Sequence, residues 1–195
     1  VYKRQEVADE DEFEIGEEYS FFVYPNRSGE LFATQNMPDI TKDKYDFAKV
    51  LKTDRDGARI DVGLPREVLV PWEDLPKIKE LWPQAGDYLL VTLRIDSNNQ
   101  MFGRLASETI VEGMFTPVMD DSKQNEMIEA RAYRLLRVGS FLLSEDGYKI
   151  FAHESERKQE PRLGEKVEVR IIGHNDKGEL NGSFLPLAHE RLDDD

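Results

Sequence analysis

The chain has 195 residues, of which 39% are hydrophobic and 34% charged, enough for one large domain or two to three small ones. Its mean hydropathy of −0.61 and the lack of any apolar run near the roughly 18 residues of a membrane span exclude a transmembrane helix and predict a cytoplasmic protein. The absence of cysteine excludes disulfides, thiolate catalysis and Cys-type zinc sites.

The net charge of −14 is unevenly distributed along the chain. The excess of acidic side chains falls in residues 1–42, 108–128 and 188–195, whereas residues 43–107 and 129–187 are close to neutral. The acidic balance therefore does not exclude a polyanionic partner for the two balanced segments.

One pattern occurs three times: a Gly-acid pair, a strand with alternating apolar residues, a polar turn and a second short strand. The copies begin at Gly16, Gly86 and Gly164. Residues 1–42 hold only this closing hairpin, so we interpret them as the C-terminal half of a first domain, and we expect residues 1–5 to pack poorly.

The second and third copies are preceded by three more predicted strands each. In residues 43–108 these are 47–52, 58–62 and 68–70; in residues 129–187 they are 132–137, 140–143 and 149–151. Five strands with a helical element between strands three and four are the order of the OB-type Greek-key barrel, so the sequence predicts an all-β protein of tandem OB barrels.

Helical elements are predicted at two places outside the strands. Apolar residues at helical spacing predict a helix over 72–82, with Trp72 and Trp82 filling gaps around it. Residues 109–128 form an acidic connector in which 122–128 is a candidate short helix, and residues 188–195 form an acidic tail.

Three segments of the last copy, 138–142, 150–156 and 163–167, resemble the RNA-binding domain first described in ribosomal protein S-one. Closer still, residues 61–65, 75–83 and 155–164 are similar to the conserved virulence factor B family of bacteria. That resemblance implies three OB domains followed by a winged helix. By this interpretation the chain is a fragment that lacks the start of the first domain and the winged helix.

The resemblance also implies a binding face on the third copy, where Phe141 and His153 match stacking positions. Cationic side chains predicted to follow the RNA backbone are Arg137, Lys149, Arg157 and Lys158. Strand alternation leaves open whether Phe141 faces the core or the surface. Arg131, Arg134 and Arg137 can share one face only if their strand contains a bulge.

The second copy is predicted to have a degenerate binding face. Asp56 and Arg59 replace the aromatic residues of the first hairpin, and Pro71 replaces the histidine. We therefore expect this copy to be structural or to face a protein.

Taken together, these features predict a non-catalytic, cytoplasmic protein that binds single-stranded RNA weakly and in a salt-sensitive manner, and that regulates gene expression or virulence in bacteria. The alternative is an interaction scaffold whose degenerate barrels dock an RNA-processing or transcription component. A third hypothesis is a DNA-binding regulator that acts through the absent winged helix. No phosphate loop, nucleophile elbow or metal-binding histidine pair is present, so no enzyme activity, cofactor, metal or membrane partner is expected.

Overall fold

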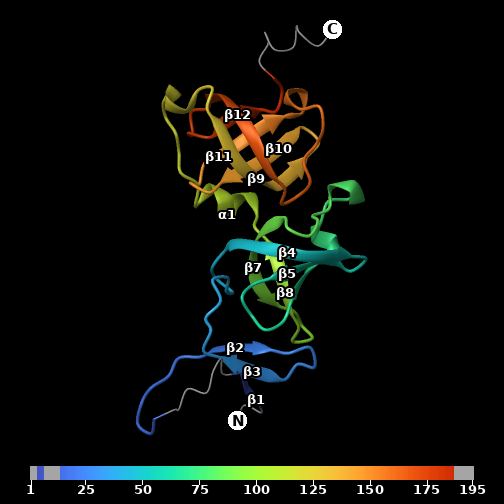
Figure 1. Ribbon diagram of the computed structural model, residues 1–195, viewed down its shortest axis with the longest axis vertical. Helices are drawn as coiled ribbons and strands as arrows, with labels where there is room; N and C mark the ends of the chain where they lie inside the picture. Colours follow the sequence, from blue (N-terminus) through green and yellow to red (C-terminus); the bar gives the residue numbers. More distant parts are fainter. Residues whose placement is uncertain (1–3, 7–13, 187–195) are drawn as a thin grey trace. The chain divides into compact units, whose positions relative to one another are not determined.

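The computed structural model describes residues 4–6 and 14–186. The chain divides into two compact units, one of residues 1–75 and 84–105 and the other of residues 76–83 and 106–195. Each unit contains one closed five-stranded barrel, as the sequence predicts (Figure 1). No helix in the described part of the chain is long and apolar enough to cross a membrane.

The first unit opens with a three-stranded sheet in the order β1-β3-β2. The predicted closing hairpin is β2 (Phe22–Pro25) with β3 (Leu31–Thr34). The strand β1 (Arg4–Glu6) pairs in parallel with β3. The open edge of β3 offers hydrogen-bonding groups, and the backbone of Arg4 and Gln5 pairs with it. The expectation that residues 1–5 pack poorly stays a prediction, and residues 1–3 lie outside the described residues.

The first barrel has the strand order β4-β5-β6-β8-β7. Its strands are β4 (Asp46–Asp54), β5 (Gly57–Asp61), β6 (Val68–Pro71), β7 (Tyr88–Ile95) and β8 (Met101–Leu105). Val50, Ile60 and Val70 are completely buried inside it, as expected where β-branched residues alternate inward.

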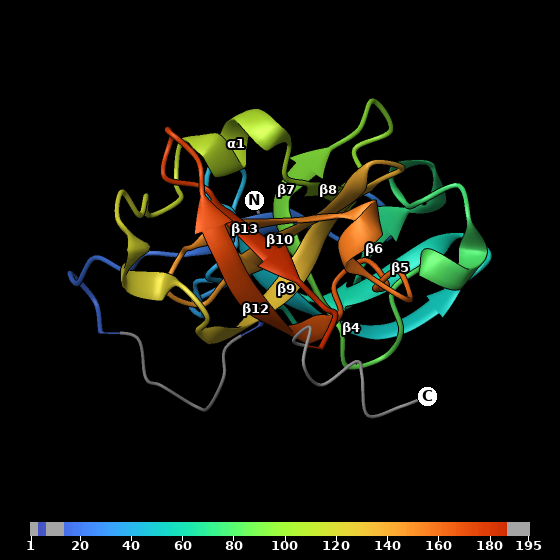
Figure 2. The ribbon, with the colours of Figure 1, turned by 90° about the horizontal axis from the view of Figure 1, so that it is seen from above.

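The second barrel has the order β10-β11-β13-β12-β9. Figure 2 shows its strands β9, β10, β12 and β13 from above. Its strands are β9 (Met127–Leu136), β10 (Gly139–Ser144), β11 (Lys149–His153), β12 (Lys166–His174) and β13 (Leu180–Ser183). The core includes Leu142, Ile150 and Val169, each 0% exposed.

The helical elements differ from the sequence predictions. Residues 72–82 form two 3₁₀ turns, η1 (Trp72–Asp74) and η2 (Lys79–Leu81), because Pro76 disfavours the helical conformation of Leu75 and cannot donate a backbone hydrogen bond. Trp72 is 54% exposed and fills no gap, whereas the Trp82 indole donates to the Pro76 carbonyl at 2.6 Å.

In the connector, the α-helix is α1 (Glu108–Glu112). Residues 122–128 contain the end of the 3₁₀ turn η3 (Asp121–Lys123), a turn over 124–125 and the start of β9. The backbone N–H of Val118 donates to the carbonyl of Gly178, and the Val118 side chain belongs to the core of the second barrel. This part of the connector is therefore a structural piece of that barrel.

Candidate nucleic-acid interface

Aromatic side chains gather on the outside of the second barrel across β9, β10 and β11. The rings of Phe141 and Phe151 lie 4.9 Å apart between centroids, in register on paired strands. Their neighbours Ser140, Leu142 and Ala152 are 0% exposed and point inward. Phe141 therefore faces outward, which resolves the alternative that the alternation left open. We define the aromatic face as Tyr133, Phe141, Phe151 and His153.

Two members of this face, Tyr133 and Phe151, were not predicted from the sequence. Phe151 lies two residues before His153 on the same strand, so period-2 alternation is the signal that points to it. Its ring lies over Gly139: a Cβ added there would be 2.4 Å from the Ala152 carbonyl oxygen and 2.6 Å from the Phe151 ring. The glycine thus makes room for the Phe151 ring.

The strand β9 contains a bulge, which is the condition under which arginines of this strand could share one face. Its register with β10 shifts between Phe141 and Leu142, which pair with Arg134 and Ala132 and leave Tyr133 as the extra residue. The Arg134 guanidinium lies 5.7 Å from the Phe141 ring centroid. Arg137 is exposed in the turn that follows β9 and forms no ion pair with any described residue. The Lys149 ammonium lies 5.8 Å from the Phe141 ring centroid, so Arg134 and Arg137 are the two arginines, but not all of the cations, beside the aromatic face.

Glu108, on α1, occupies the other end of this face. Its carboxylate accepts hydrogen bonds from the Tyr133 hydroxyl at 3.2 Å and from Arg134 Nη1 at 3.1 Å, and it pairs with the ammonium of Lys149. Burial, and then the nearby Glu108 carboxylate, raise the pKa of the Tyr133 phenol. Glu108 therefore places a negative charge where the face would otherwise present only donors.

Lys149 does not match the prediction that it follows an RNA backbone. It is 3% exposed and lies between the carboxylates of Glu108 and Glu179. Burial lowers the pKa of Lys149, but hydrogen bonds to both carboxylates outweigh burial, and the net direction is upward. Glu108, Glu112 and Glu179 form a group that could hold a metal ion, but the Lys149 ammonium already compensates two of these three carboxylates.

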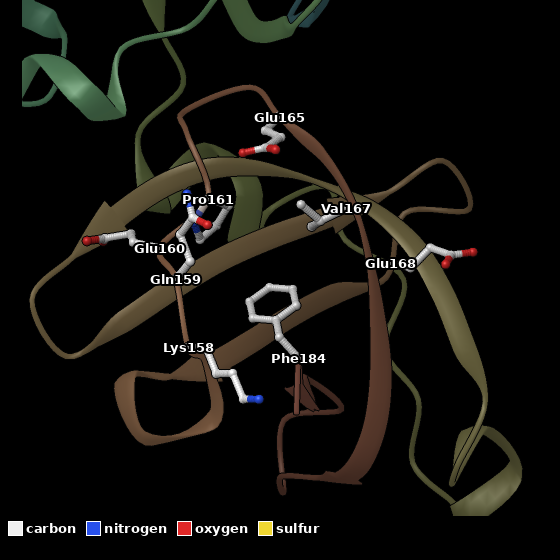
Figure 3. Close-up of a pocket in the computed structure, with 8 residues that line it drawn as sticks. All are labelled: Lys158, Gln159, Glu160, Pro161, Glu165, Val167, Glu168 and Phe184. Carbon is white, nitrogen blue, oxygen red and sulfur yellow. The ribbon is translucent and has the colours of Figure 1, made fainter. Parts of the chain in front are cut away.

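Arg157 and Lys158 also lie away from the aromatic face. The Arg157 guanidinium donates to the hydroxyl of Ser140 at 2.5 Å and pairs with Glu160 at 3.1 Å, so it braces the buried serine of β10. Lys158 lines a separate hollow of about 410 Å³ beside Phe184 (Figure 3). None of the side chains that line this hollow belongs to the aromatic face.

His153 is exposed at the edge of the aromatic face. It caps the 3₁₀ turn η4 (Glu154–Glu156), where its Nδ1 accepts from the backbone N–H of Ser155 at 3.2 Å. Its ring lies 6.3 Å from that of Phe151 in an edge-to-face arrangement. Of the six predicted site residues, the structure thus brings Phe141, His153 and Arg137 to one accessible region.

The corresponding surface of the first barrel has a different composition. Arg59 on β5 lies where β10 has Phe141, and it pairs with Asp54 at 3.4 Å and Asp56 at 3.6 Å. A backbone hydrogen bond from Asp56, and then the Arg59 charge, lower the pKa of the Asp54 carboxyl, and together they outweigh burial, which raises it. The pair of facing aromatic rings on adjacent strands is therefore a property of the second barrel.

Comparison with protein-family models gives two adjacent matches. Residues 45–104 match a model described as the first S1-like domain of CvfB, and residues 114–186 match one described as the second domain of the virulence regulatory factor CvfB. The second match begins at residue 114, within the predicted connector.

Curated relatives match almost the whole chain. Proteins named conserved virulence factor B from Staphylococcus epidermidis (strain RP62A) and Staphylococcus aureus (strain USA300) are 90% and 83% identical over 98% of the chain. The chain spans 64% of the length of each. A crystal structure from Streptococcus pneumoniae, described as a multidomain protein with nucleic acid binding domains, is 32% identical with a TM-score of 0.83, covering 92% of this chain and 65% of that one.

Proposed function

The chain belongs to the conserved virulence factor B family, and from that premise we propose that it is a non-catalytic protein of the bacterial cytoplasm that binds single-stranded RNA and thereby regulates gene expression. The aromatic face carries this proposal. OB barrels bind single strands by stacking bases on aromatic side chains while cations contact the backbone.

The geometry of the aromatic face suits short stretches of unpaired nucleotides. Phe141 and Phe151 offer two adjacent ring surfaces, and His153 extends them to the edge of the barrel. Arg134 and Arg137 are placed to contact one or two phosphates. Stacking is tolerant of base identity, so we expect weak sequence preference.

The test is fluorescence anisotropy with a labelled single-stranded RNA and the whole 195-residue chain at two salt concentrations. The double variant Phe141→Ala with His153→Ala should bind at least about tenfold more weakly, because each stacked base contributes on the order of 1–3 kcal/mol. Ile172→Ala is the matched control, since it removes an exposed apolar side chain from β12, outside the aromatic face.

Equal binding by the wild type and the folded double variant would contradict the proposal. Binding that salt does not weaken would contradict it as well, because phosphate contacts release counterions. Either result would favour the scaffold hypothesis, in which the barrels dock a protein.

A further inference from the structure

The first barrel carries a hollow of about 630 Å³ lined by residues of β5, β6 and β8 and of the loops beside them. This volume is in the range of small-ligand sites. Its apolar lining includes Leu69 on β6 and Phe102 on β8, which pair directly across the two parallel strands. We call it the first-barrel groove. The prediction of a degenerate face did not include Phe102, the aromatic ring that β8 contributes here.

Arg66, in the loop between β5 and β6, supplies this groove with an unpaired cation. Its Nε and Nη1 atoms are shielded from solvent and have no hydrogen-bond partner in the part of the chain that the structure describes. Burial, and then the nearby Arg27, lower the pKa of the Arg66 guanidinium. A shielded cationic donor without an acceptor is costly, and an anion placed between the two arginines would relieve both effects.

Asp74, at the end of η1, supplies the groove with an unpaired acceptor. Its Oδ2 atom is shielded and accepts no hydrogen bond within the described residues. Arg104 Nε lies 3.8 Å away, close enough for an ion pair but too far for a hydrogen bond. The groove thus combines a donor for an anion, an apolar surface and an acceptor for an N–H group.

The other carboxylates that line the groove are either exposed, as Glu73 is, or already engaged. Glu67 pairs with Arg27 at 3.6 Å and with Lys52 at 3.4 Å. Asp96 accepts the backbone N–H groups of Asn98 and Gln100 and so stabilises its own turn. Arg66 and Asp74 therefore remain as the groups whose hydrogen-bonding capacity an incoming ligand would complete.

We propose that the first-barrel groove binds one nucleotide unit of RNA whose base carries an exocyclic amino group, with the phosphate on Arg66, the base on Leu69 and Phe102, and the amino group on Asp74. This site is additional to the aromatic face of the second barrel and goes beyond the function proposed above. An acidic peptide could also reach Arg66, but its carboxylate side chains offer no planar ring to Phe102.

The experiment is a titration of the ¹⁵N-labelled whole chain with cytidine and uridine 5′-monophosphates, followed through backbone amide shifts. Cytosine presents an amino group where uracil presents a carbonyl oxygen, so the cytidine nucleotide should bind more tightly and shift the amides of Arg66, Leu69 and Phe102. Arg66→Gln should weaken this binding about tenfold, the effect of losing one charge-assisted hydrogen bond. The matched control Arg55→Gln removes the same charge from a side chain that is 92% exposed and outside the groove, and should leave binding unchanged.

Asp74→Asn tests the base contact separately. Asparagine can either accept from cytosine or donate to uracil, so this variant should bind both nucleotides equally. The proposal is overturned if the wild type binds both nucleotides equally, if Arg55→Gln weakens binding as much as Arg66→Gln, or if no amide of the groove shifts. Shifts confined to Phe141 and Phe151 would overturn the groove site while supporting the aromatic face. Shifts confined to the groove would support the groove site and contradict the aromatic face.

Discussion

At the scale of single residues, Glu108 is the side chain that most directly opposes RNA on the aromatic face. Its carboxylate engages Tyr133, Arg134 and Lys149, the donors nearest the Phe141 ring. Sequence reasoning could not place it there, because Glu108 belongs to the connector and nothing in its local pattern points to β9 or β11. The same limit explains Lys149, whose charge is visible in the sequence while its two carboxylate partners are not.

Neutralising Glu108 should strengthen RNA binding. In Glu108→Gln, Arg134 is released from its ion pair and the face loses one repulsive charge, so we expect affinity to rise roughly three- to tenfold at low salt, with less gain at high salt. Anisotropy with the same labelled RNA measures this. Glu129→Gln removes the same charge from an exposed pair with Lys166 and should change affinity little; an equal gain in that control would show that only net charge matters.

Gly139 should be intolerant of any side chain. The Cβ of Gly139→Ala would lie 2.4 Å from a backbone oxygen, which cannot shift cheaply, so we expect a loss of about 2–4 kcal/mol in the stability of the second barrel. Gly173→Ala is the control, because no atom lies within 4 Å of the Cβ that it would add. Hydrogen exchange of β10 and β11 amides in increasing urea reports this loss, and equal protection in the two variants would contradict the steric argument.

At the scale of elements, alternation predicted the strands and failed for helices. The strands β4, β9 and β12 contain period-2 patterns that match their buried faces, so their positions were accessible from the sequence, whereas β7 is buried continuously from Leu89 to Leu93. The apolar residues over 72–82 are spaced as in a helix, but Pro76 sterically disfavours the helical backbone of the residue before it, and the apolar pattern does not include this effect. The direction of the Phe141 side chain could not be predicted from β10 alone, because the packing of the neighbouring strands decides which face of β10 is buried.

Glu108, Lys149 and Glu179 form an ion-pair network that connects three elements, α1, β11 and the turn before β13. The stability that this network contributes should depend on pH. At both glutamates burial raises the pKa, but hydrogen bonds from Lys149 outweigh burial, and the folded-state pKa of each carboxyl lies below its ordinary value of 4.5. A lowered pKa contributes stability that is present above the unfolded value and is lost as pH falls through the folded value. We expect the midpoint of unfolding of the second barrel to fall below pH 4.5, and to fall less steeply in Glu108→Gln. If Glu108→Gln leaves the pH profile unchanged, the ion-pair network contributes nothing to stability.

At the scale of the whole molecule, the net charge of −14 works against any polyanion. The residues of the second barrel are balanced in charge, and the charge of Lys149 beside the Phe141 ring is neutralised by Glu108 and Glu179. Arg134 and Arg137 are therefore the cations of the aromatic face that can contact phosphates. Long-range attraction is therefore weak, and binding has to come from stacking plus a small number of phosphate contacts. This arrangement predicts a shallow salt dependence rather than the steep one of strongly basic nucleic-acid-binding proteins.

The slope of log affinity against log salt gives the number of phosphates contacted. Two cations on single-stranded RNA predict a slope of about −1.4, because each contributes roughly −0.7. Arg137→Gln should reduce its magnitude by about 0.7, whereas Lys158→Gln, which alters a side chain lining the separate hollow in Figure 3, should leave it unchanged. Anisotropy titrations at four or more salt concentrations measure these slopes. A slope steeper than about −3 in the wild type would require cations beyond those of the aromatic face, and a loss on Lys158→Gln would place the RNA path across the hollow beside Phe184 instead.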